Sequence, residues 1–414
     1  MSQAPTTAPG LGWPVVVPQS DPSDGLGWPE RRPAEFVEPE FTEPEFTEPE
    51  LNEPLAVEPE TTAIDLRDRP PAAAADPEQV HPMPWIPDDV SRGTDEVRAM
   101  VAQSLPQGDE ETPLAQQVSE DARRRIVLGN RALPRPTKTR IMAVANQKGG
   151  VGKTTTTVNL AAALAQGGLS VLVIDLDPQG NASTALGIDH HAEVPDIYEV
   201  VVESRPLAEV VQATPDFAEL LCAPATLDLA GAEIELVSLV ARENRLLRAL
   251  QTYRATRDAQ GARRLDYVFI DCPPSLGLLT VNAFVAADEV LIPIQCEYYA
   301  LEGLSQLLKN IELIQAHLNP GLHVSSILMT MFDGRTRLSS QVADEVRLHF
   351  PEESLRTTVP RSVRISEAPS HGQTVMTYDP SSSGALSYLE AATELAERGA
   401  AMTNGETANG EEHR

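Results

Sequence analysis

The sequence has few aromatic residues, few lysines and few cysteines, and these shortages exclude several classes of protein. Aromatic side chains make up 4% of the 414 residues, and no apolar run approaches the ~18 residues that a membrane-spanning helix needs. The cysteines, Cys222, Cys272 and Cys296, are widely spaced without a CxxC pair, which argues against a disulfide framework or a multi-cysteine metal site in one chain. Met1–Gly10 has neither a basic start nor an apolar core, so we expect no secretory signal and a cytoplasmic location.

Charge is distributed unevenly. The formal net charge is −29, and residues 1–136 hold 22 of the 35 prolines and 26 acidic against 11 basic residues. Such a composition cannot bury enough apolar surface to offset its ordering entropy, so we predict that residues 1–138 form a disordered acidic, proline-rich extension. The rest of the chain is long enough for a large α/β core. Because the whole chain is acidic, contact with nucleic acid would require a local basic patch.

A five-residue repeat lies within this extension. Phe36–Glu40 reads FVEPE, the next two units both read FTEPE, and degenerate copies continue to Glu60. One proline in each unit favours extended, polyproline-like chain. Two interpretations remain open: an acidic spacer, or a docking strip for a polar scaffold within residues 1–136, with Phe36, Phe41 and Phe46 as weak apolar anchors.

The remaining pattern alternates between strands and helices. A short helix is predicted near residues 113–128, and the sequence leaves open whether it packs on the domain that follows. From residue 139 to about 400, apolar strands are expected at 141–145, 170–174, 267–270, 289–294 and 324–331, and helices at 153–166, 227–250, 301–317 and 384–398. This alternation predicts an α/β fold with a mostly parallel, doubly wound sheet covered by helices on both faces. A polar tail follows at 401–414.

The most informative segment follows the first strand and opens a helix. It reads Lys148, Gly149, Gly150, Val151, Gly152, Lys153, Thr154 and Thr155. Glycines let backbone N–H groups turn onto phosphate oxygens, and the start of a helix favours negative charge. Lysine at 153 would neutralise β/γ oxygens, and the hydroxyl at 154 would ligate Mg²⁺. The segment therefore predicts a nucleotide-phosphate loop.

A second lysine distinguishes this loop from the plain GxxxxGK[ST] motif. Gln147 stands where that motif has its first glycine, and Lys148 follows it. The chain has only four lysines, and two of them lie in this six-residue stretch. Since the chain otherwise prefers arginine, we infer that the loop requires the geometry of an ammonium group.

Aspartates end two other predicted strands. Asp175 and Asp177 follow VLVI, and Asp271 follows DYVFI. Carboxylates at the carboxyl ends of buried parallel strands lie beside the phosphate loop, where they can organise Mg²⁺ and water. Alone, each aspartate could be a turn or capping residue; their register with the loop favours a role at the site.

Together these segments resemble a known family. KGGVGKTT, DLDPQGN and DCPPSLG are similar to the deviant Walker ATPases, specifically the ParA partition proteins, and the resemblance continues through PIQCE at 293–297, MTMFDGRTRLSSQV at 329–342 and VPRSVRISEAPSHG at 359–372. It covers residues 139–400. It implies a P-loop NTPase fold, ATP and Mg²⁺ as cofactors, and slow Mg²⁺-dependent ATP hydrolysis.

The resemblance also implies roles for individual residues. Lys148 would reach the partner subunit's nucleotide, and Lys153 would hold phosphate. Thr154, Asp177 and Asp271 would form the metal site, with Asp177 positioning the attacking water and Asp271 as the Walker B residue. Arg335, Arg337, Arg361 and Arg364 would bind DNA phosphates, since guanidinium groups match them and no aromatic base-stacking platform is apparent.

The implied function is DNA segregation. An ATP-bound homodimer would bind nucleoid DNA without sequence preference, and a ParB-like partner would stimulate hydrolysis to position chromosome or plasmid origins. The absence of a helix-turn-helix pattern in residues 1–138 favours the chromosomal type, but the cargo stays open.

Two other classes fit less well. A MinD-like ATPase acting on a membrane needs a basic amphipathic C-terminal helix, whereas this chain ends in TNGETANGEEHR; another cargo-positioning ATPase on a protein scaffold stays open. An iron–sulfur ATPase similar to nitrogenase iron protein needs two suitably placed cysteines per chain. Packing accounts for Cys272, which directly follows Asp271.

Overall fold

The structure is a computed structural model that describes residues 113–128, 131–191 and 193–411, with side chains from 121 to 401. The predictions for residues 1–112, including the pentapeptide repeats and their docking role, lie outside the described residues.

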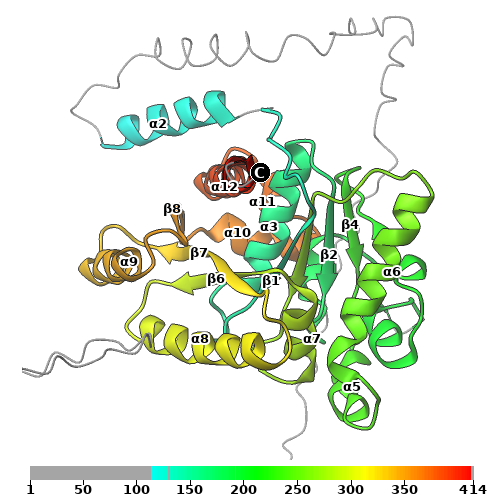
Figure 1. The fold of residues 1–414 in the computed structure, drawn as a ribbon. Helices are drawn as coiled ribbons and strands as arrows, with labels where there is room; N and C mark the ends of the chain where they lie inside the picture. Colours follow the sequence, from blue (N-terminus) through cyan, green and yellow to red (C-terminus); the bar gives the residue numbers. More distant parts are fainter. Residues whose placement is uncertain (1–112, 129–130, 192, 412–414) are drawn as a thin grey trace, which may run out of the picture. The chain divides into compact units, whose positions relative to one another are not determined.

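One mixed, mainly parallel sheet organises the described chain (Figure 1). Its strand order is β3-β4-β2-β5-β1-β6-β7-β8, and only β3 and β4 pair antiparallel. The strands are β1 (Arg140–Val144), β2 (Val171–Asp175), β3 (Gln212–Ala213), β4 (Leu220–Ala223), β5 (Tyr267–Asp271), β6 (Glu289–Gln295), β7 (His323–Phe332) and β8 (Ser354–Pro360). β1, β2 and β5 are buried along their whole length, as the apolar runs of a sheet covered on both faces require.

Helices cover both faces of this sheet. The α-helices are α2 (Pro113–Leu128), α3 (Lys153–Gln166), α4 (Asn181–Ala185), α5 (Leu229–Leu236), α6 (Arg245–Ala259), α7 (Leu278–Ala286), α8 (Ala300–His317), α9 (Arg337–His349), α10 (Val363–Glu367), α11 (Val375–Tyr378) and α12 (Ser383–Glu411). The other helical segments are the π-helical turn η2 (Glu199–Glu203) and the 3-10 turns η3 (Leu207–Glu209), η4 (Arg242–Asn244) and η5 (Ala368–His371).

Alternate strand residues separate two apolar cores. Met142 and Val144 of β1 pack in the core formed with α3, α4, α11 and α12, whereas Ile141 and Ala143 pack in the core formed with α5 to α9. Figure 1 shows α3 and α12 on one side of the strands and α7 and α8 on the other. The period-two alternation of a strand thus builds a doubly wound fold.

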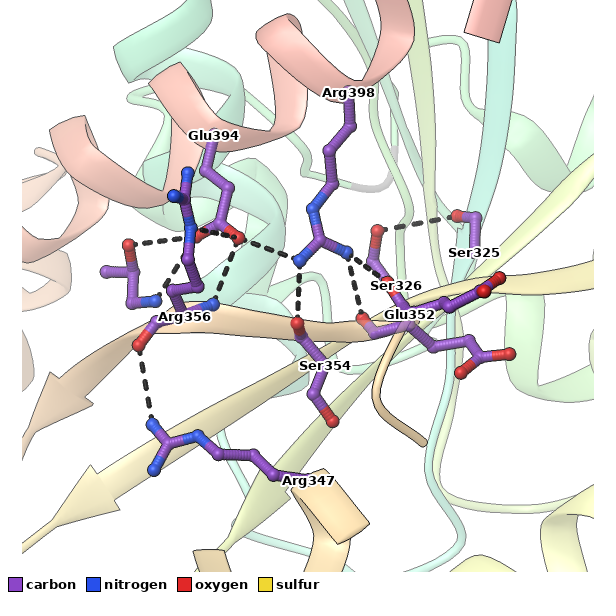
Figure 2. Close-up of polar contacts among 10 residues, drawn as sticks. Ser325, Ser326, Arg347, Glu352, Ser354, Arg356, Glu394 and Arg398 are labelled. Atoms are coloured by element: carbon purple, nitrogen blue, oxygen red, sulfur yellow. Dashed lines mark hydrogen bonds and ion pairs between the residues drawn. The ribbon is translucent and has the colours of Figure 1, made fainter. Parts of the chain in front are cut away.

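A buried carboxylate attaches α12 to β8 (Figure 2). Glu394 is 4% exposed and accepts hydrogen bonds from the backbone N–H groups of Arg356 (3.0 Å) and Thr357 (3.2 Å). Arg398, one turn further along α12, donates to Glu394 (2.8 Å) and to the carbonyl of Ser354 (2.6 Å). Burial alone would raise the pKa of Glu394, but these N–H groups and Arg398 lower it.

The helix α2 packs against α12. Arg124 donates to both carboxylate oxygens of Glu390 at 2.7 Å, and Arg125 donates to the carbonyl of Ser381 at 2.6 Å. Further along, the side chain of Leu133 packs beside Gly167 at the end of α3. These contacts answer the question that the sequence left open, because the short predicted helix is attached to the domain that follows.

The fold class and most elements are confirmed, with three corrections. The predicted helix at 227–250 is divided: Ala241 has a left-handed φ of 51°, and the side chain of Asn282 on α7 bonds to the Arg242 carbonyl and the Leu246 N–H across the break. The last helix extends beyond 398 to Glu411. The strands β3, β4 and β8 were not predicted. Among the described residues, no helix is long and apolar enough to cross a membrane.

Candidate functional site

The loop between β1 and α3 has the backbone of a phosphate cradle. Gly150 and Gly152 have φ angles of 73° and 89°, a left-handed region where a side chain would be strained. Gly152 directly precedes the first turn of α3, whose N–H groups have no partner within the helix. The hydroxyl of Thr330 on β7 donates to the Val151 carbonyl at 2.7 Å. This bond attaches the loop to the sheet.

The two loop lysines lie in different environments. Lys153 is 7% exposed, and burial lowers its pKa while the charges of Asp271 and Asp177 oppose that shift. Lys148 lies at the exposed rim of the phosphate loop, with 36% of its side chain exposed, and its Nζ donates to Oε2 of Glu297 at 2.8 Å. Lys153 therefore faces the carboxylates of its own site, whereas Lys148 contacts the segment between β6 and α8.

Asp271, at the end of β5, is the buried carboxylate behind the loop. Thr157 on α3 donates to its Oδ1 at 2.9 Å, whereas Oδ2 has no hydrogen-bond partner among the described residues. Burial and the nearby charge of Asp175 raise the pKa of Asp271 to about 8. An unsatisfied buried carboxylate oxygen is costly unless a cation or its water approaches it.

The neighbouring carboxylates have separate tasks. Asp175 pairs in register with Asp271 across β2 and β5, and it accepts hydrogen bonds from the Ser183 N–H (2.8 Å) and hydroxyl (2.7 Å). Burial raises the pKa of Asp175 to about 6. Asp177 is 8% exposed and accepts from the Gln179 N–H at 3.0 Å. Asp175 thus anchors α4, and Asp177 lies nearer the loop's lysine.

The predicted metal residues fit Mg²⁺. Asp271 supplies the unsatisfied oxygen, Thr154 directly follows Lys153 in the first turn of α3, and the charges of Asp177 and Asp271 both act on Lys153. Hydroxyl and carboxylate oxygens are the ligands that Mg²⁺ takes alongside nucleotide phosphates. The three predicted residues therefore lie around one site.

A cavity beside the loop was not predicted. Its volume is about 250 Å³, and its lining includes Thr155 after the phosphate lysine, Val359 and Pro360 at the end of β8, and Tyr388 on α12. Met331, which also lines the cavity, has a left-handed φ of 49°, and such strain in a non-glycine residue often accompanies a binding site. The cavity is lined by residues of KGGVGKTT, MTMFDGRTRLSSQV and VPRSVRISEAPSHG, which the sequence analysis singled out, and by α12. It could not be predicted, because these segments lie far apart in the sequence.

The four predicted DNA-binding arginines lie after the neighbouring strands β7 and β8. Arg335 pairs with Asp333 at 2.9 Å, and Arg364 pairs with Glu367 at 3.2 Å. The two loops begin side by side, because Phe332 at the end of β7 pairs with Pro360 at the end of β8. The hydrogen bonds from Arg335 lower the pKa of Asp333 to about 2. Arg337 and Arg361 are exposed, and Arg361 also lines the cavity. The arginines share one region, with acidic residues between them.

The fold and loop define the class, a P-loop nucleotide-binding protein, and comparison with known proteins narrows it. A family model described as an AAA domain matches residues 139–324. The sporulation initiation inhibitor protein Soj of Bacillus subtilis is 51% identical over 260 residues, covering 63% of this chain and 99% of Soj. The chromosome partitioning protein ParA of Myxococcus xanthus is 50% identical over 259 residues, covering 63% of this chain and 88% of that protein. The chain belongs to the ParA/Soj family of chromosome-partitioning ATPases.

Solved structures agree on the fold. A cobyrinic acid a,c-diamide synthase from Mycobacterium smegmatis, solved with a bound ATP analog and magnesium, is 38% identical with a TM-score of 0.51, covering 61% of this chain and 93% of that one. The ATP complex of a single-residue variant of Cyanothece McdA, at 21% identity and a TM-score of 0.52, covers 63% of this chain and 96% of that one, and shows the fold alone. The predicted family, ATPase activity and cofactors, ATP and Mg²⁺, are confirmed at the level of the family.

Proposed function

We propose that this chain is a DNA-segregation ATPase whose ATP-bound dimer binds nucleoid DNA without sequence preference. A ParB-like partner would stimulate hydrolysis, so that the dimer positions chromosome or plasmid origins. The observation that carries the proposal is the pair of loop lysines: Lys153 serves its own buried site, and Lys148 stands at the rim, available to a second subunit. A cytoplasmic, nucleoid-associated location follows from this function.

Each site residue has a defined task in this proposal. Lys153 neutralises phosphate oxygens between Asp177 and Asp271, and the N–H groups from Gly149 to Thr155 donate to phosphate oxygens. Bound Mg²⁺ would neutralise charge on the phosphates, held by Thr154, Asp177 and Asp271. Asp177, which the loop lysine faces, orients the attacking water. The cavity lined by Thr155 and Pro360 adjoins the loop and suits the nucleoside.

Exposed apolar side chains at the sheet edge that carries the phosphate loop support dimerisation there. Leu276, after β5, is 36% exposed, and Tyr298 and Tyr299, after β6, are 76% and 66% exposed. These strands flank β1, and parallel strands end on the same side, so the side chains flank the phosphate loop. Apolar surface of this kind marks an interface, which here would bury the nucleotides between two subunits.

The variant Asp177→Ala tests the cycle. It should bind ATP, form the dimer and remain on DNA, because the phosphate loop, Thr154 and Asp271 still hold the nucleotide and Mg²⁺. Steady-state ATP hydrolysis should fall by roughly 100-fold or more, because the carboxylate that orients the water is lost. Release of phosphate is compared with retention of the variant on immobilised DNA of random sequence. Hydrolysis at the wild-type rate would exclude Asp177 as the catalytic residue, and loss of ATP binding would make its role structural.

A further inference from the structure

The ion pair between Lys148 and Glu297 lies beside the proposed dimer face, because Glu297 directly precedes the exposed Tyr298 and Tyr299. Oε2 of Glu297 accepts from the Lys148 ammonium at 2.8 Å, and Oε1 accepts from Nε2 of Gln295. The two side chains are 36% and 46% exposed. The carboxylate therefore holds the lysine from one side, and solvent or a partner can approach from the other.

Hydrogen bonds beside β6 hold the backbone of both residues of this pair. The Lys148 N–H donates to Oδ1 of Asn146 at 3.0 Å, and Nδ2 of Asn146 donates to the Pro293 carbonyl at 2.8 Å. On the other side, the Glu297 N–H donates to the Gln295 carbonyl at 2.8 Å, and the Glu297 carbonyl accepts from the Ala300 N–H at 3.0 Å as α8 begins. The pair is therefore preorganised by the fold, which lowers the entropy cost of forming it.

Lys148 cannot serve a phosphate and this carboxylate equally. An ammonium has three donors, but the charge attraction to Glu297 weakens as the lysine turns toward another anion. A half-exposed ion pair is worth at most about fivefold in an equilibrium constant. A triphosphate carries several negative charges, so it can displace Glu297, although the displacement reduces the net affinity.

We propose that Glu297 is a positioning residue that holds Lys148 in the monomer and competes with the partner subunit's nucleotide for it, thereby weakening the ATP-bound dimer. This inference rests on the proposed function, because it takes Lys148 as the group that crosses the interface. Glu297 favours the monomer, and the phosphates of the second subunit's nucleotide favour the dimer. The balance sets the protein concentration at which ATP drives dimerisation.

The test measures the dimer dissociation constant of the full chain by sedimentation equilibrium, with Mg²⁺ and a non-hydrolysable ATP analogue. Glu297→Gln keeps the size of the side chain and removes its charge. Since a dimer contains two such pairs, its dissociation constant should fall by about 2- to 25-fold, most strongly at low salt, with analogue binding to the monomer unchanged. Glu302→Gln is the matched control: it removes the same charge from the exposed first turn of α8 and should change nothing.

Different results would contradict the role of Glu297 and the proposed function on which it rests. An unchanged or weaker dimer in Glu297→Gln overturns the competition, because a merely structural role for Glu297 would loosen the loop and weaken association. Equal tightening by Glu302→Gln would also overturn it, since the effect would then reflect overall charge. A Lys148→Ala variant that dimerises like wild type would refute the proposed role of Lys148 itself.

Discussion

At the residue scale, the two lysines of one loop are separated by burial. Lys153 is enclosed with two carboxylates, and Lys148 is held at the rim by a carboxylate of another segment. The two lysines are only five positions apart, yet they have different partners, because the fold buries one of them and leaves the other exposed.

Replacing Lys153 by alanine should abolish ATP binding. The change removes the buried positive charge and leaves Asp177 and Asp271 facing the phosphates, so affinity should fall by roughly 100-fold or more, the scale of one or two charged hydrogen bonds. Titration with a fluorescent ATP analogue measures this loss. Lys309→Ala, an exposed lysine on α8, is the control, and a loss below threefold in Lys153→Ala would contradict the assignment.

The three thiols should be inert in the native protein. Cys222, Cys272 and Cys296 are at most 3% exposed, and burial raises the pKa of each, for Cys296 to about 11. A chromogenic disulfide reagent at pH 8 should label none of them within minutes and all three after denaturation. Rapid labelling of the native chain would contradict the packing interpretation and reopen a role for Cys272.

Sequence predicts some of these residues better than others. The glycines, lysines and threonines of the loop are contiguous, so their spacing alone indicates a phosphate cradle. Thr157 and Glu297 become visible only once the strands are placed side by side, because their partners lie more than a hundred positions away. Asp175 was visible at a strand end, but its bond to Ser183, and hence its structural task, was not.

At the element scale, length and apolar content decide which elements the sequence predicts. β1, β5 and β6 are apolar and were predicted within one or two residues, whereas β8 reads SLRTTVP and offers no apolar run. β4 has only four residues. The break before α6 depends on Asn282 of another helix, a tertiary contact that local propensity cannot anticipate.

Deletions on either side of α2 should differ in stability. Removing residues 1–112 should leave ATP binding, dimerisation and the melting temperature unchanged, because every described site element lies later in the chain. Removing residues 1–136 also deletes Arg124 and Leu133 and their contacts with α12 and α3, so the melting temperature should fall by about 2–6 °C with ATP binding retained. Equal melting temperatures for the two deletions would show that the α2 contacts contribute nothing, and an unfolded 113–414 chain would contradict an independent domain.

At the scale of the whole molecule, charge opposes the proposed function. The chain carries −29, so attraction to DNA must come from the loops after β7 and β8. All four arginines of these loops are exposed, and two of them, Arg335 and Arg364, are paired with acids that DNA phosphates must displace. Residues 1–136, with 26 acidic and 11 basic residues, should compete with DNA for these arginines, so their removal should tighten binding at low salt and have less effect at high salt.

The central claim, an ATP-dependent dimer that binds DNA through phosphate contacts, is tested most directly by one titration. Fluorescence anisotropy measures the binding of the full chain to duplexes of unrelated sequence, with ATP or ADP and over a range of salt. We predict binding only with ATP and Mg²⁺, equal affinity across sequences, and a steep loss between about 50 and 200 mM salt. Arg337→Glu with Arg364→Glu should weaken binding about tenfold or more without changing ATP affinity, whereas Arg248→Glu on α6 should not. Binding that ignores ATP, salt or the two arginines would contradict the account.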